Sequence, residues 1–379
     1  MRLSCGTIPK FNGKFLFEMN GLIVNKILNI NGVDCDLNRA ESLSWLEASE
    51  EPHLAELSAF LRQWADSGEY LIQQTSGSTG SPKLLKVRRS QMLHSARLTI
   101  EFFGLRQGMT ALLCMSPAFI GGRMMVIRAL VAGMKIVVVK PEENPLVRLN
   151  QKIDFAAMVP FQFSRTIKEN PEKFALVDKL ILGGGPVPKL LEDQAQNIKT
   201  EVWHTYGMSE TLSHIALRPI NGQGRSARFR LLPGISLRLD DRSCLVIDAP
   251  HLNEETLITN DIGRIYPDGT FEILGRADNV IVSAGHKIHV ENLEQQIAAF
   301  LDTPFIISSL PDNEAGEVVV LVIGESPSPR RLFELWKMLE SALDNKDLPR
   351  RMITLDQIPL TGSGKPHRQT IREKLAAKP

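Results

Sequence analysis

Between residues 111 and 205 the chain alternates short apolar runs with stretches of helical spacing, and this alternation is what most constrains its fold. The apolar runs have the length of strands and lie at 111–115, 135–139, 155–159, 180–182 and 202–205. The stretches between them have the length of helices and lie at 124–132, 161–168 and 188–196. Strands and helices that take turns in this way predict an α/β fold, doubly wound, with a mostly parallel sheet and helices on both faces.

The pattern changes twice after this region, and the changes predict the domain organisation. Beyond Arg218 come short β-like segments that end in a hairpin around Pro267-Asp268-Gly269. After Gly275-Arg276-Ala277-Asp278 a new α+β pattern begins. A chain of 379 residues suits two domains. We therefore expect an N-terminal domain over 1–276, with a β-rich part at about 218–276, and a small C-terminal domain over 277–379.

Charge and cysteine content exclude several classes of protein. The 44 basic and 43 acidic side chains leave a net charge of +1, which predicts no attraction to nucleic acid. The cysteines have neither metal-site nor disulfide spacing, which favours a reducing, cytoplasmic location; they are Cys5, Cys35, Cys114 and Cys244. The most hydrophobic region, 118–139, contains three basic residues and predicts no membrane insertion.

One run of small and hydroxyl residues is a candidate phosphate-binding loop, Thr75-Ser76-Gly77-Ser78-Thr79-Gly80-Ser81-Pro82-Lys83. Gly77 and Gly80 permit backbone angles at which successive N–H groups turn toward one anion, and Lys83 adds positive charge. The spacing differs from that of a loop ending in Gly-Lys-Ser/Thr, because Ser81 and Pro82 precede the lysine. A flexible Ser/Gly surface turn is the alternative interpretation.

Four other polar clusters follow. Gly183-Gly184-Gly185-Pro186 comes directly after a predicted strand, where an ordinary turn is the alternative. Tyr206-Gly207-Met208-Ser209-Glu210 offers a ring on which adenine can stack, a hydroxyl, and a carboxylate that can lie near magnesium. Asp261 and Arg276 can bind ribose hydroxyls. Lys365 lies in a Gly/Ser/Pro-containing loop. Taken alone, such Asp, Arg and Lys side chains are usually just solvated.

In this order, the clusters resemble the acyl-adenylate-forming superfamily over about residues 70–370. The run 75–83 is similar to its phosphate loop, 183–186 to its adenine-side loop, and 206–210 to its Tyr-Gly-x-Thr-Glu motif with Ser209 in place of threonine. Asp261 corresponds to the ribose-binding aspartate, although Asn260 replaces the usual glycine. Lys365 corresponds to the catalytic lysine.

The resemblance implies a two-step reaction with ATP, Mg²⁺ and CoA. A carboxylic acid would attack the α-phosphorus of ATP, with Lys365, Ser209, Glu210 and Mg²⁺ supporting the charge that develops there. CoA would then attack the acyl-adenylate. Between the two steps the C-terminal domain would rotate about Asp278 and bring a glycine loop containing Gly285 to the pantetheine channel.

The segment 117–133 resembles the corresponding helix of o-succinylbenzoate–CoA ligases, which implies an acid with a second carboxylate. A carboxylate in a partly buried pocket needs a cation, so Arg128 or, as second choice, Arg123 is the candidate, with Phe119 beside the aromatic ring. Solvated arginines and a core Phe119 are the alternatives. A CoA ligase for another aryl or short-chain acid, an amino-acid adenylation domain and a non-catalytic nucleotide-binding relative remain competing hypotheses.

Overall fold

The computed structural model describes residues 16–19, 22–66, 68–74, 84–301, 303–324, 327–359 and 366–376. The predicted phosphate loop at 75–83 and Lys365 lie outside these ranges.

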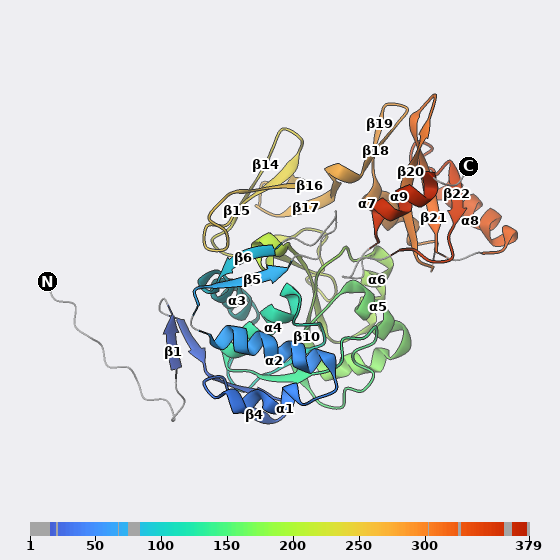
Figure 1. The fold of residues 1–379 in the computed structure, drawn as a ribbon. Coiled ribbons are helices and arrows are strands. Elements are labelled where there is room, and N and C mark those ends of the chain that lie inside the picture. The colour runs from blue at the N-terminus through green and yellow to red at the C-terminus, as the bar shows by residue number, and fades with distance from the viewer. Residues whose placement is uncertain are drawn as a thin grey trace.

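A large mixed sheet forms the body of the molecule (Figure 1). Its strands run in the order β13 (Arg230–Leu231), β12 (His214–Pro219), β11 (Glu201–Gly207), β10 (Val177–Leu182), β9 (Ile153–Met158), β7 (Thr110–Leu113), β8 (Lys135–Val138), β3 (Ile27–Ile30) and β4 (Val33–Asp36). The strands from β11 to β3 pair in parallel, whereas β12, β13 and β4 are antiparallel additions at the two edges. The α/β fold predicted from the alternating pattern is confirmed.

Helices cover both faces of this sheet, as β7 illustrates. Ala111 and Leu113 belong to one apolar core, which also takes in the helices α2, α3 and α4. Leu112 and Cys114 point the opposite way, into a second core with α5 and α6. A strand buried on both faces reads as a continuous apolar run, which is how the sequence presents it. These helices span α2 (Pro52–Ala65), α3 (Arg89–Phe103), α4 (Ile120–Ala132), α5 (Pro160–Glu169) and α6 (Lys189–Gln194).

A separate antiparallel sheet consists of β14 (Ser236–Leu239), β15 (Cys244–Asp248), β16 (Leu257–Ile265) and β17 (Phe271–Arg276). The expected hairpin is confirmed, since β16 pairs with β17 around the turn at 267–269. This sheet begins at Ser236, whereas β12 pairs with β11 and β13 pairs with β12, so these two strands extend the large sheet.

The C-terminal region forms its own sheet from β18 (Val280–Ser283), β19 (His286–His289), β20 (Phe305–Asp312), β21 (Gly316–Ile323) and β22 (Arg351–Thr354). Its helices are α7 (Val290–Ile297), α8 (Pro329–Ala342) and α9 (Arg368–Ala376). The apolar cores of this region draw only on residues 281–375. Helix α7 lies against β17, so the C-terminal elements border the antiparallel sheet (Figure 1).

Two strands flank the segment 75–83. β5 (Tyr70–Gln74) pairs antiparallel with β6 (Leu84–Arg88), and Gln74 lies opposite Leu84. β6, which lies between this segment and α3, was not predicted from the sequence. The loop therefore joins the two strands of a hairpin, and α3 follows β6. The remaining short elements are β1 (Leu16–Met19), β2 (Leu22–Asn25), α1 (Ser44–Glu47) and the 3₁₀ helices η1 (Ala40–Leu43), η2 (Pro171–Leu176), η3 (Ala195–Asn197), η4 (Ser209–Thr211) and η5 (Ala277–Asn279).

Candidate active site

A cleft of about 2060 Å³ lies where the large sheet, the antiparallel sheet and α7 meet. Most of the site residues predicted from the sequence line it: Phe119, Arg128, Gly183, Gly184, Gly185, Tyr206, Ser209, Glu210, Asp261, Arg276 and Asp278. Two predicted residues that the structure describes, Arg123 and Gly285, are not part of its lining. The cleft thus brings together residues that are up to 159 positions apart in the sequence (Phe119 to Asp278).

The carboxyl ends of parallel strands supply one wall of the cleft. Gly183 follows the last residue of β10, and Ser209 and Glu210 follow β11 in η4. This is the edge at which open α/β sheets bind ligands. Gly207 is required by close packing, because a Cβ atom there would lie 2.2 Å from the Ser213 carbonyl oxygen. The turn at Gly207 therefore holds the end of β11 directly against the start of β12.

A chain of polar contacts crosses the cleft from Tyr206 to Asp278. The Tyr206 hydroxyl donates to Asp261 Oδ2 at 2.8 Å, and Arg276 Nη1 donates to Asp261 Oδ1 at 3.0 Å. Arg276 also binds both carboxylate oxygens of Asp278, at 2.9 and 2.6 Å. Arg276 therefore bridges two carboxylates and links β17 to the start of the C-terminal region.

Burial and neighbouring charges set the protonation states of the residues in this series of polar contacts. Burial, followed by the negative charge of Asp261, raises the pKa of Tyr206, so its hydroxyl stays a hydrogen-bond donor. The hydrogen bond to Asp278 raises the pKa of Arg276. Burial is the largest single influence on Asp278 and works against its ionisation, but the hydrogen bond to Arg276, the positive charge of Arg276 and smaller hydrogen bonds together outweigh burial and lower the pKa of that carboxyl. Both carboxylates keep free lone pairs for a ligand hydroxyl.

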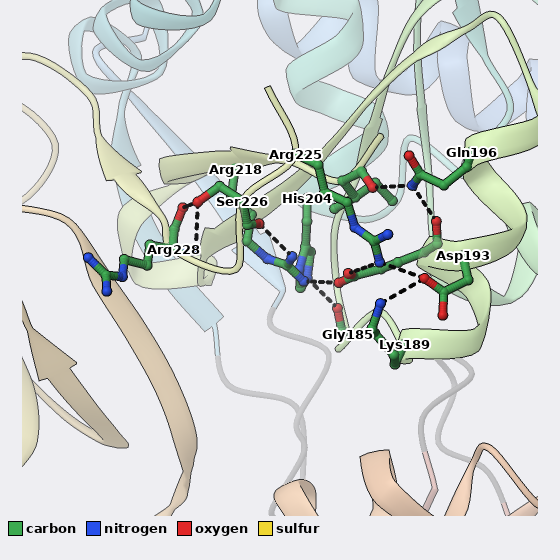
Figure 2. A network of polar contacts seen from close by, with 11 residues as sticks. Gly185, Lys189, Asp193, Gln196, His204, Arg218, Arg225, Ser226 and Arg228 are labelled. Atoms are coloured by element: carbon green, nitrogen blue, oxygen red, sulfur yellow. Dashed lines mark hydrogen bonds and ion pairs between the residues drawn. The ribbon is translucent and has the colours of Figure 1, made fainter. Parts of the chain in front are cut away.

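His204 anchors the glycine segment to β11 (Figure 2). Its Nε2 lies 3.1 Å from the Gly185 carbonyl oxygen, which can only accept, so Nε2 carries the proton. Burial, and secondarily the charge of Arg218, lowers the pKa of His204 to about 3. A neutral histidine thus fixes the position of the loop at 183–185 on the cleft wall.

An ion-pair network next to His204 ties α6 to β12 (Figure 2). Arg218 Nη2 lies 2.5 Å from Glu192 Oε1, and both side chains are only 8% exposed. Arg225 reaches Glu192 at 3.4 Å and Asp193 at 2.7 Å, and Lys189 also binds Asp193 at 2.7 Å. Because Glu192, Arg218 and Arg225 all line the cleft, the network forms a rigid part of its wall.

Arg128 is the most unusual residue of the cleft, since a fully charged side chain is 2% exposed on a helix with a buried apolar face. Nη2 donates to Ser213 Oγ at 2.5 Å and Nη1 lies 3.6 Å from Met125 Sδ. Nε has no partner among the described residues, and no carboxylate there pairs with the guanidinium. Burial lowers the pKa of Arg128 to about 9, so the group stays cationic at neutral pH.

The two other residues expected near the acid differ from Arg128. Arg123 donates to the carbonyl oxygens of Pro117 and Ile72 and lies over the Phe60 ring, outside the cleft. Its guanidinium therefore serves the packing of α4 against neighbouring segments. Phe119 lies at the N-terminal end of α4, is 39% exposed and faces the cleft, so it is not a core residue.

The side chains that the structure describes do not form a dedicated metal cage. Among the described residues, no group of three or more His, Cys, Asp or Glu side chains could hold an ion. Glu210 is exposed on the cleft wall. Mg²⁺ commonly takes one or two protein carboxylates together with substrate phosphates, so a lone glutamate fits that use of the ion and no dedicated metal cage.

Sequence reasoning missed several residues of the cleft wall. Ser213 and His214 follow the 206–210 motif by a few residues, and the position of His214 directly before the apolar run 215–217 was a signal that could have identified the histidine. Glu192 and Arg218 gave no such signal, since their pairing depends on how α6 meets β12. In the part of the chain that the structure describes, no helix is long and apolar enough to cross a membrane.

The comparisons with known proteins agree with this geometry. Residues 31–269, more than half of the chain, match the family described as AMP-binding enzyme. A probable 2-succinylbenzoate–CoA ligase from Mycobacterium tuberculosis (strain ATCC 25618 / H37Rv) is 28% identical over 344 residues, which cover 82% of this chain and 86% of the relative.

Solved structures show the same fold. An acyl-CoA synthetase (AMP-forming)/AMP-acid ligase II-like protein from Dyadobacter fermentans is 33% identical, with a TM-score of 0.57, and the match covers 89% of this chain and 98% of that one. The o-succinylbenzoate coenzyme A synthetase from Bacillus subtilis, solved with ATP and magnesium, has a TM-score of 0.67 at 19% identity, covering 79% and 68% of the two chains.

Proposed function

The chain belongs to the AMP-binding enzyme family, and we propose that it is an ATP-dependent ligase that joins 2-succinylbenzoate to CoA through an acyl-adenylate. The observation that carries the choice of acid is the buried guanidinium of Arg128 on the cleft wall. The relatives named as 2-succinylbenzoate–CoA ligases support the same choice.

The physical argument starts from the cost of burying a charge. Breaking a buried ion pair by removing one partner costs about 3–5 kcal/mol, because an uncompensated charge remains. Arg128 is in this uncompensated state, with Nε unsatisfied and no carboxylate partner among the described residues. A ligand carboxylate in the cleft would supply the counter-charge. 2-Succinylbenzoate has a carboxyl group on its ring in addition to the one on its succinyl chain, so one can pair with Arg128 while the other reacts.

The nucleotide would occupy the opposite part of the cleft. We assign the adenine to the segment 183–185 and Tyr206, and the ribose hydroxyls to Asp261 and Arg276, whose carboxylate and guanidinium face the cleft. The run 75–83, with Thr75, Ser76, Gly77, Ser78, Thr79, Gly80 and Lys83, would bind the phosphates that leave as pyrophosphate. Its assignment stays a prediction from the sequence, as does that of Lys365.

The first step forms a bond between a carboxylate oxygen and the α-phosphorus of ATP, and the bond to the β-phosphate breaks. Lys365 and the donors of Ser209 would hold the negative charge of the phosphate oxygens in place. Glu210 would hold Mg²⁺, which when bound would neutralise charge on the same oxygens. In the second step the CoA thiol gives up its proton to solvent, its thiolate sulfur attacks the acyl carbon, and AMP leaves with the electron pair of the acyl–oxygen bond.

The two steps would use two orientations of the C-terminal region. We propose a division into 1–276 and 277–379 with the hinge at Asp278, because the apolar cores on the two sides of this position do not mix. Rotation there would bring Gly285 and its loop toward the cleft, where they could line the path of CoA. Gly285 has a φ of +79° and open space around it, as a loop that approaches a ligand needs.

The test is pyrophosphate release that requires both ATP and an acid, measured over a panel of aromatic and short-chain acids with and without CoA. We expect 2-succinylbenzoate to be preferred and its CoA thioester to accumulate. Preference for another acid would keep the reaction class and remove the substrate. Absence of acid-dependent release over the whole panel would contradict the enzyme assignment.

A further inference from the structure

A series of hydrogen bonds leads from Arg128 into the core between α3 and β12. Arg128 Nη2 lies 2.5 Å from Ser213 Oγ, which lies 3.4 Å from His214 Nδ1. His214 Nε2 in turn lies 3.2 Å from Thr99 Oγ1, and that hydroxyl donates to the Ser95 carbonyl oxygen at 3.4 Å. The series joins the cleft wall to the buried face of α3. None of its members after Arg128 was part of the predicted site.

The direction of each hydrogen bond in this series follows from its two ends. The Thr99 hydroxyl donates its only proton to a carbonyl oxygen, so it must accept from His214 Nε2–H. A neutral imidazole with its proton on Nε2 has an acceptor at Nδ1. The Ser213 hydroxyl therefore donates to Nδ1 and presents its lone pairs to Arg128, which can only donate.

The charge of Arg128 reinforces this arrangement. His214 is 5% exposed, and burial, followed by the positive charge of Arg128, lowers the pKa of His214 well below 6.5. A protonated His214 would be a donor at both nitrogens and would compete with Arg128 for the lone pairs of Ser213. The neutral ring with a proton on Nε2 is the state that satisfies Thr99, Ser213 and Arg128 together.

The backbone holds Ser213 in place by an uncommon conformation. Leu212 has a φ of +65° although it is not glycine, and the Ser213 N–H donates to the Thr211 carbonyl oxygen at 2.7 Å. Such a tight turn stores strain and persists only where the surroundings impose it. Gly207 allows the preceding strand to pack directly on Ser213. The serine is thus fixed from its backbone and, through His214, from its hydroxyl.

We propose that His214 is a positioning residue for acid selection: acting through Ser213, it holds the Arg128 guanidinium in the orientation that binds the second carboxylate of the substrate. This inference rests on the proposed function. With one N–H of Nη2 on Ser213, Arg128 keeps its Nε–H and further terminal N–H groups for a ligand. The series holds a long cationic side chain in one conformation, although such a side chain can otherwise adopt many rotamers.

The test compares two acids that differ only in the group that Arg128 would bind. 2-Succinylbenzoate carries the ring carboxylate, and 3-benzoylpropionate is the same acid without it. We expect His214→Leu to lower kcat/KM for 2-succinylbenzoate about tenfold or more, the loss of a hydrogen bond to a charged group, and to change kcat/KM for 3-benzoylpropionate less than about twofold. KM for ATP should be unchanged.

Two further variants separate positioning from packing. His214→Asn places an acceptor oxygen close to the position of Nδ1 and should restore most of the preference for the dicarboxylate. Thr99→Val removes the acceptor that selects the tautomer without touching Ser213 or Arg128, and should reduce the same preference even if His214→Leu fails to fold. The double variant Ser213→Ala/His214→Leu should lose no more of the preference for the dicarboxylate than Ser213→Ala alone, because the two residues act through the same series of hydrogen bonds.

The results that would overturn this inference differ from those that would overturn the proposed function. Equal losses for both acids, an unchanged acid preference in both His214→Leu and Thr99→Val, or additive losses in the double variant would overturn the inference alone. A wild-type protein that releases no pyrophosphate with any acid would overturn the proposed function and this inference with it.

Discussion

The hydroxyl of Tyr206 lies 2.8 Å from Asp261 Oδ2, and this contact joins the end of β11 in the large sheet to β16 in the antiparallel sheet. Both residues are less than 10% exposed and both line the cleft. Arg276 binds the other oxygen of Asp261 at 3.0 Å. The carboxylate that we assign to the ribose is therefore oriented from two sides before any ligand arrives, which lowers the cost of ordering it on binding.

Removal of the Tyr206 hydroxyl should weaken nucleotide binding. In Tyr206→Phe, Asp261 loses one of its two oriented donors while the ring remains. We expect KM for ATP to rise about three- to tenfold, with KM for the acid unchanged. Tyr266→Phe is the matched control, since Tyr266 donates to Glu272 at 2.8 Å and does not line the cleft. A rise in both KM values, or equal effects of the two variants, would contradict the assignment.

Arg128 should decide between dicarboxylic and monocarboxylic acids. Arg128→Met removes the charge but keeps a long apolar side chain on α4. We expect kcat/KM for 2-succinylbenzoate to fall about 10- to 100-fold, as for loss of a charged hydrogen bond, while the value for 3-benzoylpropionate is maintained or raised. Arg128→Lys keeps the charge but lacks the planar guanidinium. Its kcat/KM for 2-succinylbenzoate should therefore lie between the values of the wild type and Arg128→Met. A uniform loss for both acids in Arg128→Met would show that the residue does not select the acid.

The Glu192–Arg218 pair should matter for stability. Glu192→Gln leaves Arg218 buried beside a neutral amide, and we expect the free energy of unfolding to drop by about 3 kcal/mol or more. The neighbouring Asp193→Asn weakens the exposed contacts to Lys189 and Arg225 and should cost at most about 1 kcal/mol. Urea unfolding of both variants makes the measurement. Similar costs for the two substitutions would mean that the buried pair is worth no more than a surface one.

The free energy of unfolding should decrease as the pH drops below 6.5, in part because of His204. Its pKa is lowered to about 3 in the folded protein, so between pH 6.5 and 3 the unfolded chain takes up a proton that the folded protein does not. Each pH unit in this window then removes roughly 1.4 kcal/mol of stability per such group. His204→Gln keeps a donor for Gly185 and should flatten the pH dependence between pH 6.5 and 4.5. The exposed His286→Gln is the control, and equal slopes in wild type and His204→Gln would refute the prediction.

Lys365 should act in one half-reaction only. We expect Lys365→Ala to lower the rate of adenylate formation, measured by pyrophosphate release, by a large factor because it removes a positioned cation from the α-phosphate. Thioester formation from adenylate that is supplied in solution should change little. Comparable losses in the two half-reactions would exclude this role.

The sequence predicted the fold well where packing is repetitive. The runs at 111–115 and 155–159 became β7 and β9 within two residues, because strands buried on both faces need continuous apolar side chains. β6 escaped notice, since it is short and only Val87 among its five residues is buried. β12 was not predicted either, and local sequence does not reveal which sheet a strand joins.

The candidate site was predictable in its motifs and not in its supporting contacts. Tyr206, Asp261 and Arg276 stood out as a polar series whose order resembles a known family, and they meet in the cleft. The partner of Arg128 could not be found in this way, since Ser213 is one hydroxyl among many until the turn at Leu212 places it. Hydrogen bonds between distant segments depend on the final packing, and the sequence alone contains no spacing rule for them.

The most direct test of the proposed function is ATP-dependent pyrophosphate release by the wild-type protein with 2-succinylbenzoate and with 3-benzoylpropionate, with CoA present and the thioester product measured in the same reaction. We predict release that depends on the acid, a higher kcat/KM for 2-succinylbenzoate, and one CoA thioester for each pyrophosphate. Equal kcat/KM for the two acids, or pyrophosphate release without thioester, would contradict the proposal that this protein is a CoA ligase selecting its acid through a second carboxylate.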